Sequence, residues 1–389
     1  MMITVSCAPR TDPHMPSAMT VVKTDWKPAT AFLDSVITAG AAPGAVLGVS
    51  VAGQRYVYAT GRLTRDEPAP AEPTTVYDLA SLTKVVGLTT AVMLGVDDGK
   101  LELDAPVQRY LPAFAGAGKE LVTIRLLLAH ASGLPAWRPL FQETETREKA
   151  FALADTTALS SPPGTTDVYS DIGMIVLTQV VEAVYHERLD SLLARRVFQP
   201  LGMTSVRFLP TTERGRIAPT ELDPWRGRTL RGEVHDENAA RLDGVSGHAG
   251  LFGSAPDLLT FGEWMVAVRR YDGTVVSQAG LSSGPTAVPP LSRSIVEEFI
   301  RRQNLVPGSH RALGWDTPSP GSSAGVLLSP ASIGHVGFTG TSLWIDPERR
   351  LVIVLLSNRV NPTRANAAWA PVRARIADLV MATLFEDAR

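Results

Sequence analysis

The sequence predicts an α+β protein in which one antiparallel sheet is built from both ends of the chain and a mainly helical part is inserted between them. Strand patterns occur only near the two ends, in residues 44–59 and 337–358. The long stretch between them shows mainly the helical spacing of apolar residues, interrupted by glycine and proline. Strands from the two ends can therefore pair in a single sheet, with the terminal helices packed against it.

The N-terminal part is expected to contain one helix and one β-hairpin. Apolar residues within 25–40 recur at helical spacing and form one stripe. Apolar segments at residues 44–51 and 55–59 flank a turn near residues 52–54, which predicts a hairpin. A loop rich in proline and charged residues, 64–75, leads from this hairpin into the helical part.

The middle of the chain is expected to be helical. One helix is predicted in the stretch that begins at residue 78, with Ser81 in its first turn and its end at residues 97–100. Further helices are predicted at residues 123–130, 172–185, 189–198, 256–270 and 293–302. Residues 210–250 show little periodicity and are expected to form a long, site-lining loop. Residues 272–292 and 316–332 are rich in glycine, serine and proline and are also expected to be loops.

The C-terminal part is expected to contain a second hairpin and a closing helix. Residues 337–345 and 351–358 are strongly apolar and flank a turn at residues 346–349. Residues 364–385 have the amphipathic pattern of a helix. Both hairpins therefore stand next to a terminal helix.

We expect these elements to form a discontinuous two-domain unit. The α/β sheet domain would comprise residues 21–80 and 256–389, and the mainly helical domain residues 81–255. Residues 1–20 are expected to be disordered or leader-like. They lack an apolar signal core, so the protein as written is expected to be cytoplasmic. Residues 3–7 resemble the cleavage end of a lipoprotein signal, and a true start upstream would make the protein periplasmic or lipid-anchored.

The composition excludes several classes of protein. The chain has 389 residues, of which 44% are hydrophobic and 20% charged, enough for a sizeable core. A net charge of −2 argues against nucleic acid or an anionic membrane as a partner. No apolar run is long enough to span a bilayer. The single cysteine, Cys7, excludes an internal disulfide and a cysteine-based metal cluster.

Ser81 and Lys84 stand three residues apart in the apolar segment 78–94, so a helix places them on one face. A buried lysine has a lowered pKa, and its neutral amine can take a proton from the serine. The alternative is a helix-capping serine next to an unrelated lysine. The chain has six lysines, and Lys84 alone has a serine three residues before it, which favours the activated nucleophile.

Tyr169 and Asp171 follow a Pro/Gly loop and enter a predicted helix. A tyrosine beside a lysine ammonium has a stabilised phenolate and can act as a general base. The alternative is a buried tyrosine at a helix start. Tyr169 is the only tyrosine with Asn or Asp two residues later, which singles it out as a candidate partner of Ser81.

Residues 334–341 include His335, Gly337 and Phe338 at the start of a predicted strand. Glycine at a strand edge lets a ligand approach the backbone closely, and His335 is a candidate for donating to a substrate or binding its carboxylate. A similar His-x-Gly occurs at residues 248–250 without a following hairpin. We expect it to be structural or loop-lining.

The patterns Ser81-x-x-Lys84, Tyr169-x-Asp171 and His335-x-Gly337, in this order, resemble the three motifs of the serine β-lactamase and penicillin-binding-protein superfamily. The closest branch comprises class C β-lactamases, family VIII carboxylesterases and D-aminopeptidase-like serine hydrolases. Further phrases that resemble the family lie at residues 127–135, 163–164, 247–252 and 337–341. The resemblance runs from about residue 25 to the C-terminus. It implies a β-lactamase/DD-peptidase-like fold with the active site between the sheet domain and the helical domain.

The resemblance also implies a role for each residue. Ser81 would attack a carbonyl and form an acyl-enzyme. Lys84 would deprotonate Ser81 or hold Tyr169 as phenolate, and Tyr169 would pass the proton to the leaving group and later activate water. The backbone N–H groups of Ser81 and Phe338 would form the oxyanion hole. No metal or other cofactor is implied.

Two residues depart from the β-lactamase pattern. Asp171 replaces an asparagine, and its carboxylate would pair with Lys84, raise the lysine pKa and favour Tyr169 as the base. His335 replaces a lysine and is a weaker, pH-dependent cation. Both changes weaken recognition of the amide and carboxylate of a β-lactam.

The sequence therefore predicts a serine hydrolase that cleaves a small ester or amide through an acyl-Ser81 intermediate. Its substrate would be a carboxylesterase-type ester or a muropeptide-like fragment of cell-wall peptidoglycan. The alternatives are a class C-like β-lactamase or DD-peptidase, and a catalytically silent penicillin- or peptide-binding protein. The intact order of Ser81, Lys84 and Tyr169 argues against the silent protein.

Overall fold

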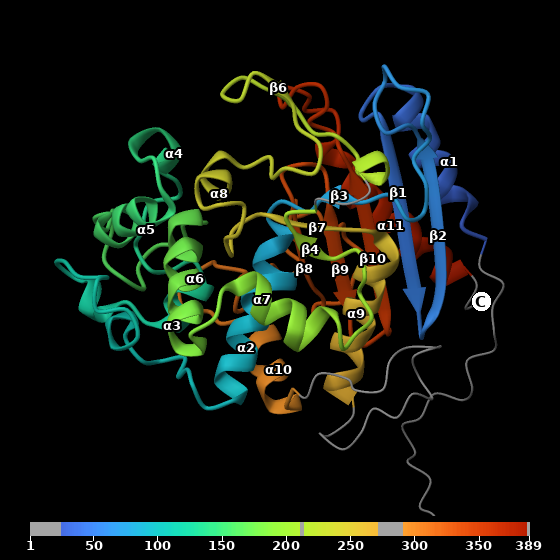
Figure 1. Ribbon diagram of the computed structural model, residues 1–389. Helices are drawn as coiled ribbons and strands as arrows, with labels where there is room; N and C mark the ends of the chain where they lie inside the picture. Colours follow the sequence, from blue (N-terminus) through green and yellow to red (C-terminus); the bar gives the residue numbers. More distant parts are fainter. Residues whose placement is uncertain (1–24, 211–213, 271–290, 387–389) are drawn as a thin grey trace, which may run out of the picture.

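The computed structural model describes residues 25–210, 214–270 and 291–386. Its largest sheet has five antiparallel strands in the order β2-β1-β10-β9-β8 (Figure 1). Their bounds are Gln54–Gly61 (β2), Gly44–Val51 (β1), Leu351–Ser357 (β10), Ser342–Asp346 (β9) and Ile333–Val336 (β8). β1 pairs with β10 at the centre, with Leu47 opposite Leu355. The two ends of the chain thus form one sheet, as predicted.

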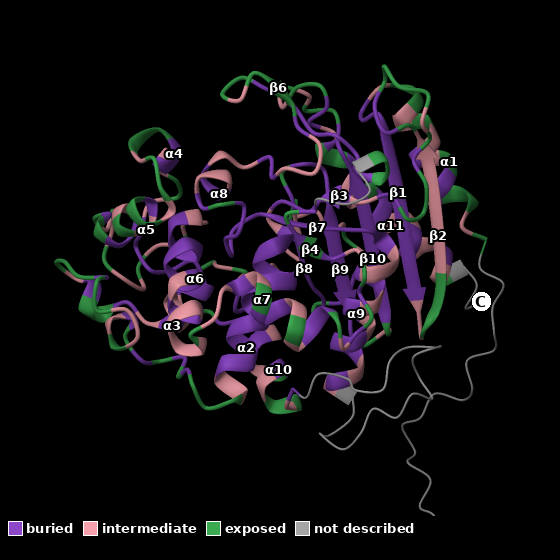
Figure 2. Ribbon diagram, viewed as in Figure 1, coloured by how far each residue is buried: buried purple, intermediate pink, exposed green. Residues whose placement is uncertain are grey.

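Helices cover both faces of this sheet. Leu47 and Ile353 point to one face and pack with α1 (Lys27–Thr38) and α11 (Ala370–Glu386). The alternate strand residues pack on the other face with α9 (Ala255–Arg270). A Cβ on Gly262 of α9 would lie 2.5 Å from Val352, so glycine allows this helix to approach the sheet. Figure 2 shows the inner strands buried, while the edge strand β2 is partly exposed.

A helical part lies beside the sheet (Figure 1). Its α-helices are α2 (Thr90–Asp97), α3 (Ile124–Leu128), α4 (Leu140–Glu143), α5 (Arg147–Thr156), α6 (Asp171–Tyr185), α7 (Leu189–Leu193), α8 (Glu237–Arg241) and α10 (Arg293–Ile300). The π-helical segment η1 (Thr83–Thr89) continues into α2, and the π-helical segment η4 (Ala194–Phe198) follows α7. The described residues also include the 3-10 turns η2 (Val107–Arg109), η3 (Lys119–Leu121) and η5 (Arg214–Arg216).

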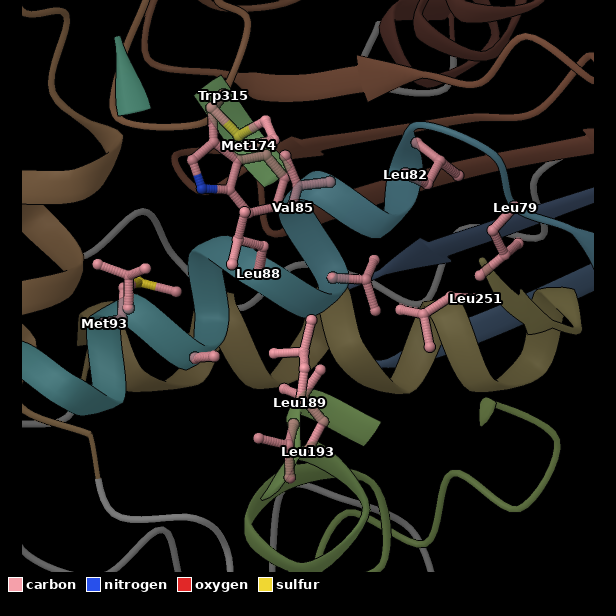
Figure 3. Close-up of a cluster of buried hydrophobic side chains, with 14 of the residues drawn as sticks. Leu79, Leu82, Val85, Leu88, Met93, Met174, Leu189, Leu193, Leu251 and Trp315 are labelled. Carbon is pink, nitrogen blue, oxygen red and sulfur yellow. The ribbon is translucent and has the colours of Figure 1, made fainter. Parts of the chain in front are cut away.

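The segment formed by η1 and α2 is the centre of the larger hydrophobic core. All residues of η1 are buried, and so are those of α2 up to Gly95. Figure 3 shows leucines from several elements around it, among them Leu193 of α7 and Leu251. A Cβ on Gly87 would lie 3.1 Å from Leu251, which shows how closely the segment is packed. The predicted core helix is therefore present, and it holds the residues around Lys84 rigidly.

Several element boundaries differ from the predicted ones. Residues 337–345 form a turn at 337–341 followed by β9, because Gly337 N–H donates to Thr341 O at 2.8 Å and Gly340 has φ +118°. The last helix begins at Ala370, with Pro371 in its first turn, where proline favours helix initiation.

The helix predicted to begin near Ser81 and to end at residues 97–100 runs from Thr83 to Asp97, through η1 and α2. The helix predicted at residues 123–130 is shorter than expected. α3 ends at Leu128, and His130 adopts a φ of +56° that no helix tolerates.

The prediction that strands occur only near the chain ends was wrong. β3 (Tyr77–Asp78), β7 (Leu251–Gly253) and β4 (Arg207–Phe208) form a small sheet, and β5 (Leu222–Asp223) pairs with β6 (Arg228–Thr229). Strands of two or three residues are too short to show an alternating pattern. The predicted loop 210–250 accordingly contains short elements.

Two predicted segments fall outside the described residues: residues 1–20, and nearly all of the loop at 272–292. Among the helices that the structure describes, none has both the length and the apolar character needed to cross a membrane.

Candidate active site

Ser81 follows β3 at a point where the backbone is strained. Ala80 has a φ of +47°, a left-handed conformation that costs free energy for a residue with a Cβ. The side chain of Asp78 fixes this bend, since it accepts hydrogen bonds from Ala80 N–H at 2.8 Å and His235 N–H at 2.7 Å. Ser81 itself remains partly exposed.

Lys84 is buried, and its amino group lies against three oxygen atoms. Nζ is 3.0 Å from Ser81 Oγ, 2.9 Å from His248 O and 2.7 Å from Asp171 Oδ1. Burial, the largest single cause, would lower the pKa of Lys84, but the charges and hydrogen bonds of Asp171 and Tyr169 together outweigh it and raise this pKa above its ordinary value. The ion pair with Asp171 favours the charged form of this amino group. Lys84 is therefore an ammonium group that donates to Ser81.

Tyr169 is held beside this pair by its neighbours in the chain. Val168 N–H donates to His130 O at 2.9 Å, and Ser170 Oγ caps α6 by accepting from Gly173 N–H at 3.0 Å. Burial raises the pKa of Tyr169, while the charge of Lys84 and hydrogen bonds with Lys84 and Ser81 act in the opposite direction. The phenol is thus neutral at rest, next to a cation that would stabilise its phenolate.

Two buried histidines lie against the Tyr169 ring, His130 at 4.6 Å and His335 at 5.8 Å between ring centroids. His130 Nδ1 accepts from Ser170 N–H at 3.0 Å, whereas His335 Nδ1 lies 2.8 Å from Val336 O and must carry a hydrogen. Burial lowers the pKa of His335 to about 4 and that of His130 well below its ordinary value. Both histidines are neutral near pH 7, so His335 would be a cation only at lower pH, in the sense of the weaker, pH-dependent cation that the sequence suggested.

We expect the free energy of unfolding to rise between about pH 4 and pH 6.5. His335 has a pKa of about 4 in the folded protein against 6.5 ordinarily, so the unfolded chain binds the extra proton first as the pH falls. The full stability is present above pH 6.5, the pKa of His335 in the unfolded chain, and it is lost as the pH falls toward about 4, the pKa in the folded protein. The loss amounts to about 3 kcal/mol. Urea unfolding at several pH values measures this slope.

The matched variants for this experiment are His335→Gln and His186→Asn. His335→Gln should reduce the slope, because it removes one of the two buried histidines with lowered pKa values; the part due to His130 should remain. His186 is exposed and has a φ of +51°, which asparagine tolerates, so His186→Asn should leave the slope unchanged. An unaltered slope in His335→Gln would contradict the assignment.

The turn at residues 337–341 is tied to the strand that precedes Ser81. Thr339 Oγ1 donates to Asp78 O at 2.7 Å, and Thr341 Oγ1 donates to Leu79 O at 3.0 Å. A Cβ on Gly337 would lie 2.5 Å from Leu79 O, so this position requires glycine. Phe338 projects from the turn, and 48% of it is exposed. The turn therefore stands beside the nucleophile candidate.

Two backbone N–H groups at this place have no protein acceptor. Within the part of the chain that the structure describes, neither Ser81 N–H nor Phe338 N–H donates a hydrogen bond. Most backbone donors of a folded protein are paired, so two free ones beside a serine are notable. Such a pair of aimed donors is what an oxyanion hole consists of.

The structure brings together the residues that the sequence singled out, namely Ser81, Lys84, Tyr169, Asp171, His335, Gly337 and Phe338. Sequence reasoning missed two contributions. His248 was expected to be structural or loop-lining, but its backbone oxygen accepts from Lys84, while Asp236 lies 2.8 Å from its imidazole. The phrase 127–135 includes His130, and only the packing of this loop against Tyr169 reveals the contact.

Comparisons with known proteins agree with this geometry. The family model "Beta-lactamase" matches residues 30–378. A protein of Escherichia coli (strain K12) named "Putative D-alanyl-D-alanine carboxypeptidase" is 30% identical over 355 residues, which cover 83% of this chain and 78% of the relative.

Solved structures share the fold. EstCE1, a hydrolase with promiscuous acyltransferase activity, has a TM-score of 0.70 at 22% identity and covers 92% of this chain and 98% of its own. A class C β-lactamase from Rhodobacter sphaeroides has a TM-score of 0.68 at 24% identity, with 92% and 99% covered. At these identities the similarity shows the fold alone. The family model and the relative from Escherichia coli show more than the fold: the chain belongs to the Beta-lactamase family and is a serine hydrolase.

Proposed function

We propose that this serine hydrolase cleaves an amide or ester bond of a small peptide-type substrate through an acyl-enzyme on Ser81. The proposal rests on one observation: Ser81 Oγ lies 3.0 Å from a buried ammonium group, beside two free backbone N–H groups. The name of the relative from Escherichia coli supports a peptide as the substrate. The substrate would lie between a sheet domain, residues 21–80 and 256–389, and a helical domain, residues 81–255.

Tyr169 is the proposed base of the acylation step. Lys84 is paired with Asp171 and already donates to Ser81, so it has no lone pair for the serine proton. The phenolate of Tyr169 takes the proton as Ser81 Oγ bonds to the substrate carbonyl carbon. Tyr169 then returns the proton to the leaving nitrogen or oxygen as that bond breaks. Lys84 stays charged throughout and stabilises the phenolate.

Deacylation repeats these steps with water in place of Ser81. The Tyr169 phenolate removes a proton from the water, whose oxygen attacks the acyl carbon. The bond to Ser81 Oγ breaks, and the serine takes its proton back from Tyr169. In both steps the negative charge on the carbonyl oxygen is stabilised by the N–H groups of Ser81 and Phe338.

A β-lactamase is the second candidate, because the family includes such enzymes. Two observations weigh against efficient β-lactam hydrolysis. Asp171 offers only acceptors where a β-lactam amide needs a donor as well. His335 is buried and neutral, so it supplies no charge for the β-lactam carboxylate. We therefore expect penicillin to react slowly.

The experiment is a parallel reaction of the protein with a fluorophosphonate, a p-nitrophenyl ester, a short peptide ending in D-Ala-D-Ala and a penicillin. Mass spectrometry of the intact protein and its peptides detects the adducts. We expect an adduct on Ser81, turnover of the ester and the peptide, and a slow penicillin adduct. Rapid penicillin hydrolysis would favour a β-lactamase. The absence of every adduct would point to a silent binding protein.

We expect kcat/KM for the ester to rise about tenfold per pH unit between pH 7 and 9, since the phenolate of Tyr169 is a minor species there. Asp171→Asn should move this rising limb to lower pH. In the wild type, the negative charge of Asp171 raises the pKa of Tyr169, although burial is the larger cause. The same charge raises the pKa of Lys84.

The control for this pH profile is Asp104→Asn. The side chain of Asp104 is 74% exposed and pairs with Arg125, away from the candidate site. Its replacement should leave the profile unchanged. A profile that falls as the pH rises from 7 to 9, or one that Asp171→Asn shifts to higher pH, would contradict Tyr169 as the base.

A further inference from the structure

Two arginines hold the backbone carbonyl groups of the 337–341 turn. Arg373 of α11 donates from Nη2 to Gly337 O at 2.6 Å, and Arg359 donates from Nε to Phe338 O at 2.9 Å. Arg359 also lies over the Phe338 ring, 4.7 Å from its centroid. Both side chains are partly buried. Each of the two peptide groups that flank Phe338 therefore accepts a hydrogen bond from a guanidinium group.

Arg373 and the turn itself together fix where the Phe338 N–H points. Gly337 O accepts from Arg373 Nη2 at 2.6 Å and from Gly340 N–H at 3.1 Å. The C=O and N–H of a trans peptide point in opposite directions, and Gly337 O belongs to the same peptide group as Phe338 N–H. Because Gly337 O is directed to α11, the N–H is directed away from that helix. At the other end of the turn, Thr341 Oγ1 donates to Leu79 O, in the segment that leads into Ser81.

Neither arginine has an acidic partner. Within the described ranges, no carboxylate lies at ion-pair distance from Arg373 or Arg359. Burial, with the like charge of Arg359 as a smaller cause, lowers the pKa of Arg373 to about 10, so it is still charged near pH 7. Two unpaired like charges at one turn carry an electrostatic cost in the resting protein. An anion that forms at the turn would relieve that cost.

We infer that Arg373 and Arg359 are positioning residues of the oxyanion hole: they hold the Gly337 and Phe338 carbonyl groups so that Phe338 N–H is aimed at the reacting carbonyl oxygen. Their charges also polarise the two peptide groups, which makes this N–H a stronger donor. The inference rests on the proposed acyl-enzyme function. It assigns to these arginines an effect on the tetrahedral state and none on substrate affinity.

The experiment compares Arg373→Met and Arg373→Lys with Arg375→Met. Arg375 is on the same helix and is exposed, so it is a matched control for loss of an arginine. We expect Arg373→Met to lower kcat for a p-nitrophenyl ester by about 10–100-fold with KM nearly unchanged, since loss of one oxyanion donor costs about 10²–10³-fold. Arg373→Lys retains a charged donor and should recover most of kcat. Arg359→Met should act in the same direction.

A second readout is the affinity for phenylboronic acid, which forms a tetrahedral anion with Ser81 Oγ. In Arg373→Met the boronate affinity should fall by the same factor as kcat. If Arg373 had only a structural role, its loss would lower thermal stability, and the changes in boronate affinity and kcat would not agree. If Arg373→Met had the kcat and boronate affinity of the wild type, the role of Arg373 in the oxyanion hole would be refuted, while the proposed function would stand. If the wild-type protein showed no Ser81-dependent turnover, the proposed function would fall and the inference with it.

Discussion

Ser81→Ala is expected to lower kcat for the p-nitrophenyl ester by at least about 10⁴-fold and to abolish labelling by a fluorophosphonate. The hydroxyl is the only group at this position that can form the acyl bond. The rest of the site should survive, because Lys84 keeps its contacts with Asp171 and His248 O at 2.7 and 2.9 Å. The melting temperature should therefore change little. Stopped assays and intact-protein mass spectrometry measure the two losses.

Ser35→Ala is the matched control for the labelling experiment. Ser35 is exposed on α1, where its hydroxyl donates only to the backbone oxygen of Phe32. This variant should be labelled and should turn over the ester at the rate of the wild type. If Ser81→Ala were still labelled at one serine, the nucleophile would be another residue and the proposed acyl-enzyme would be wrong.

The fold could be predicted from the sequence where its elements are long and strongly patterned. Strands β1 and β10 are long and largely apolar, so their pairing into one sheet followed from their places at the two chain ends. The same argument failed for β3 and β7. Their pairing depends on residues 77–78 meeting 251–253, a contact between distant segments that no local pattern contains.

The candidate site shows the same division between local and distant information. The distance of 3.0 Å between Ser81 and Lys84 follows from their spacing within one turn. The charge state of His335 did not follow, because it depends on burial and on Val336 O accepting from Nδ1. The third oxygen around Lys84 could not be predicted either, since His248 O comes from a loop 164 residues away.

Lys84→Met is expected to lower kcat/KM by about 10²–10⁴-fold, the usual range for loss of a group that supports proton transfer. Without the ammonium group, the Tyr169 phenolate loses its stabilising cation and Ser81 Oγ loses its donor. The variant should also be less stable by about 1–3 kcal/mol, because Asp171 and His248 O are left without a partner. The side chain of Asp171 is only 20% exposed, so water replaces the lost ion pair incompletely.

The double variant Lys84→Met/Asp171→Asn separates these two effects. A neutral asparagine needs no counter-ion, so the double variant should recover much of the lost stability. It should recover only a small part of the activity: loss of the Asp171 charge eases ionisation of Tyr169, but no cation has been restored beside its phenolate. Recovery of both would mean that Lys84 serves only to neutralise Asp171. If Lys84→Met kept an activity within tenfold of the wild type, the proton transfer would not depend on a positive charge at residue 84. The phenolate of Tyr169 would then have to be stabilised by another group.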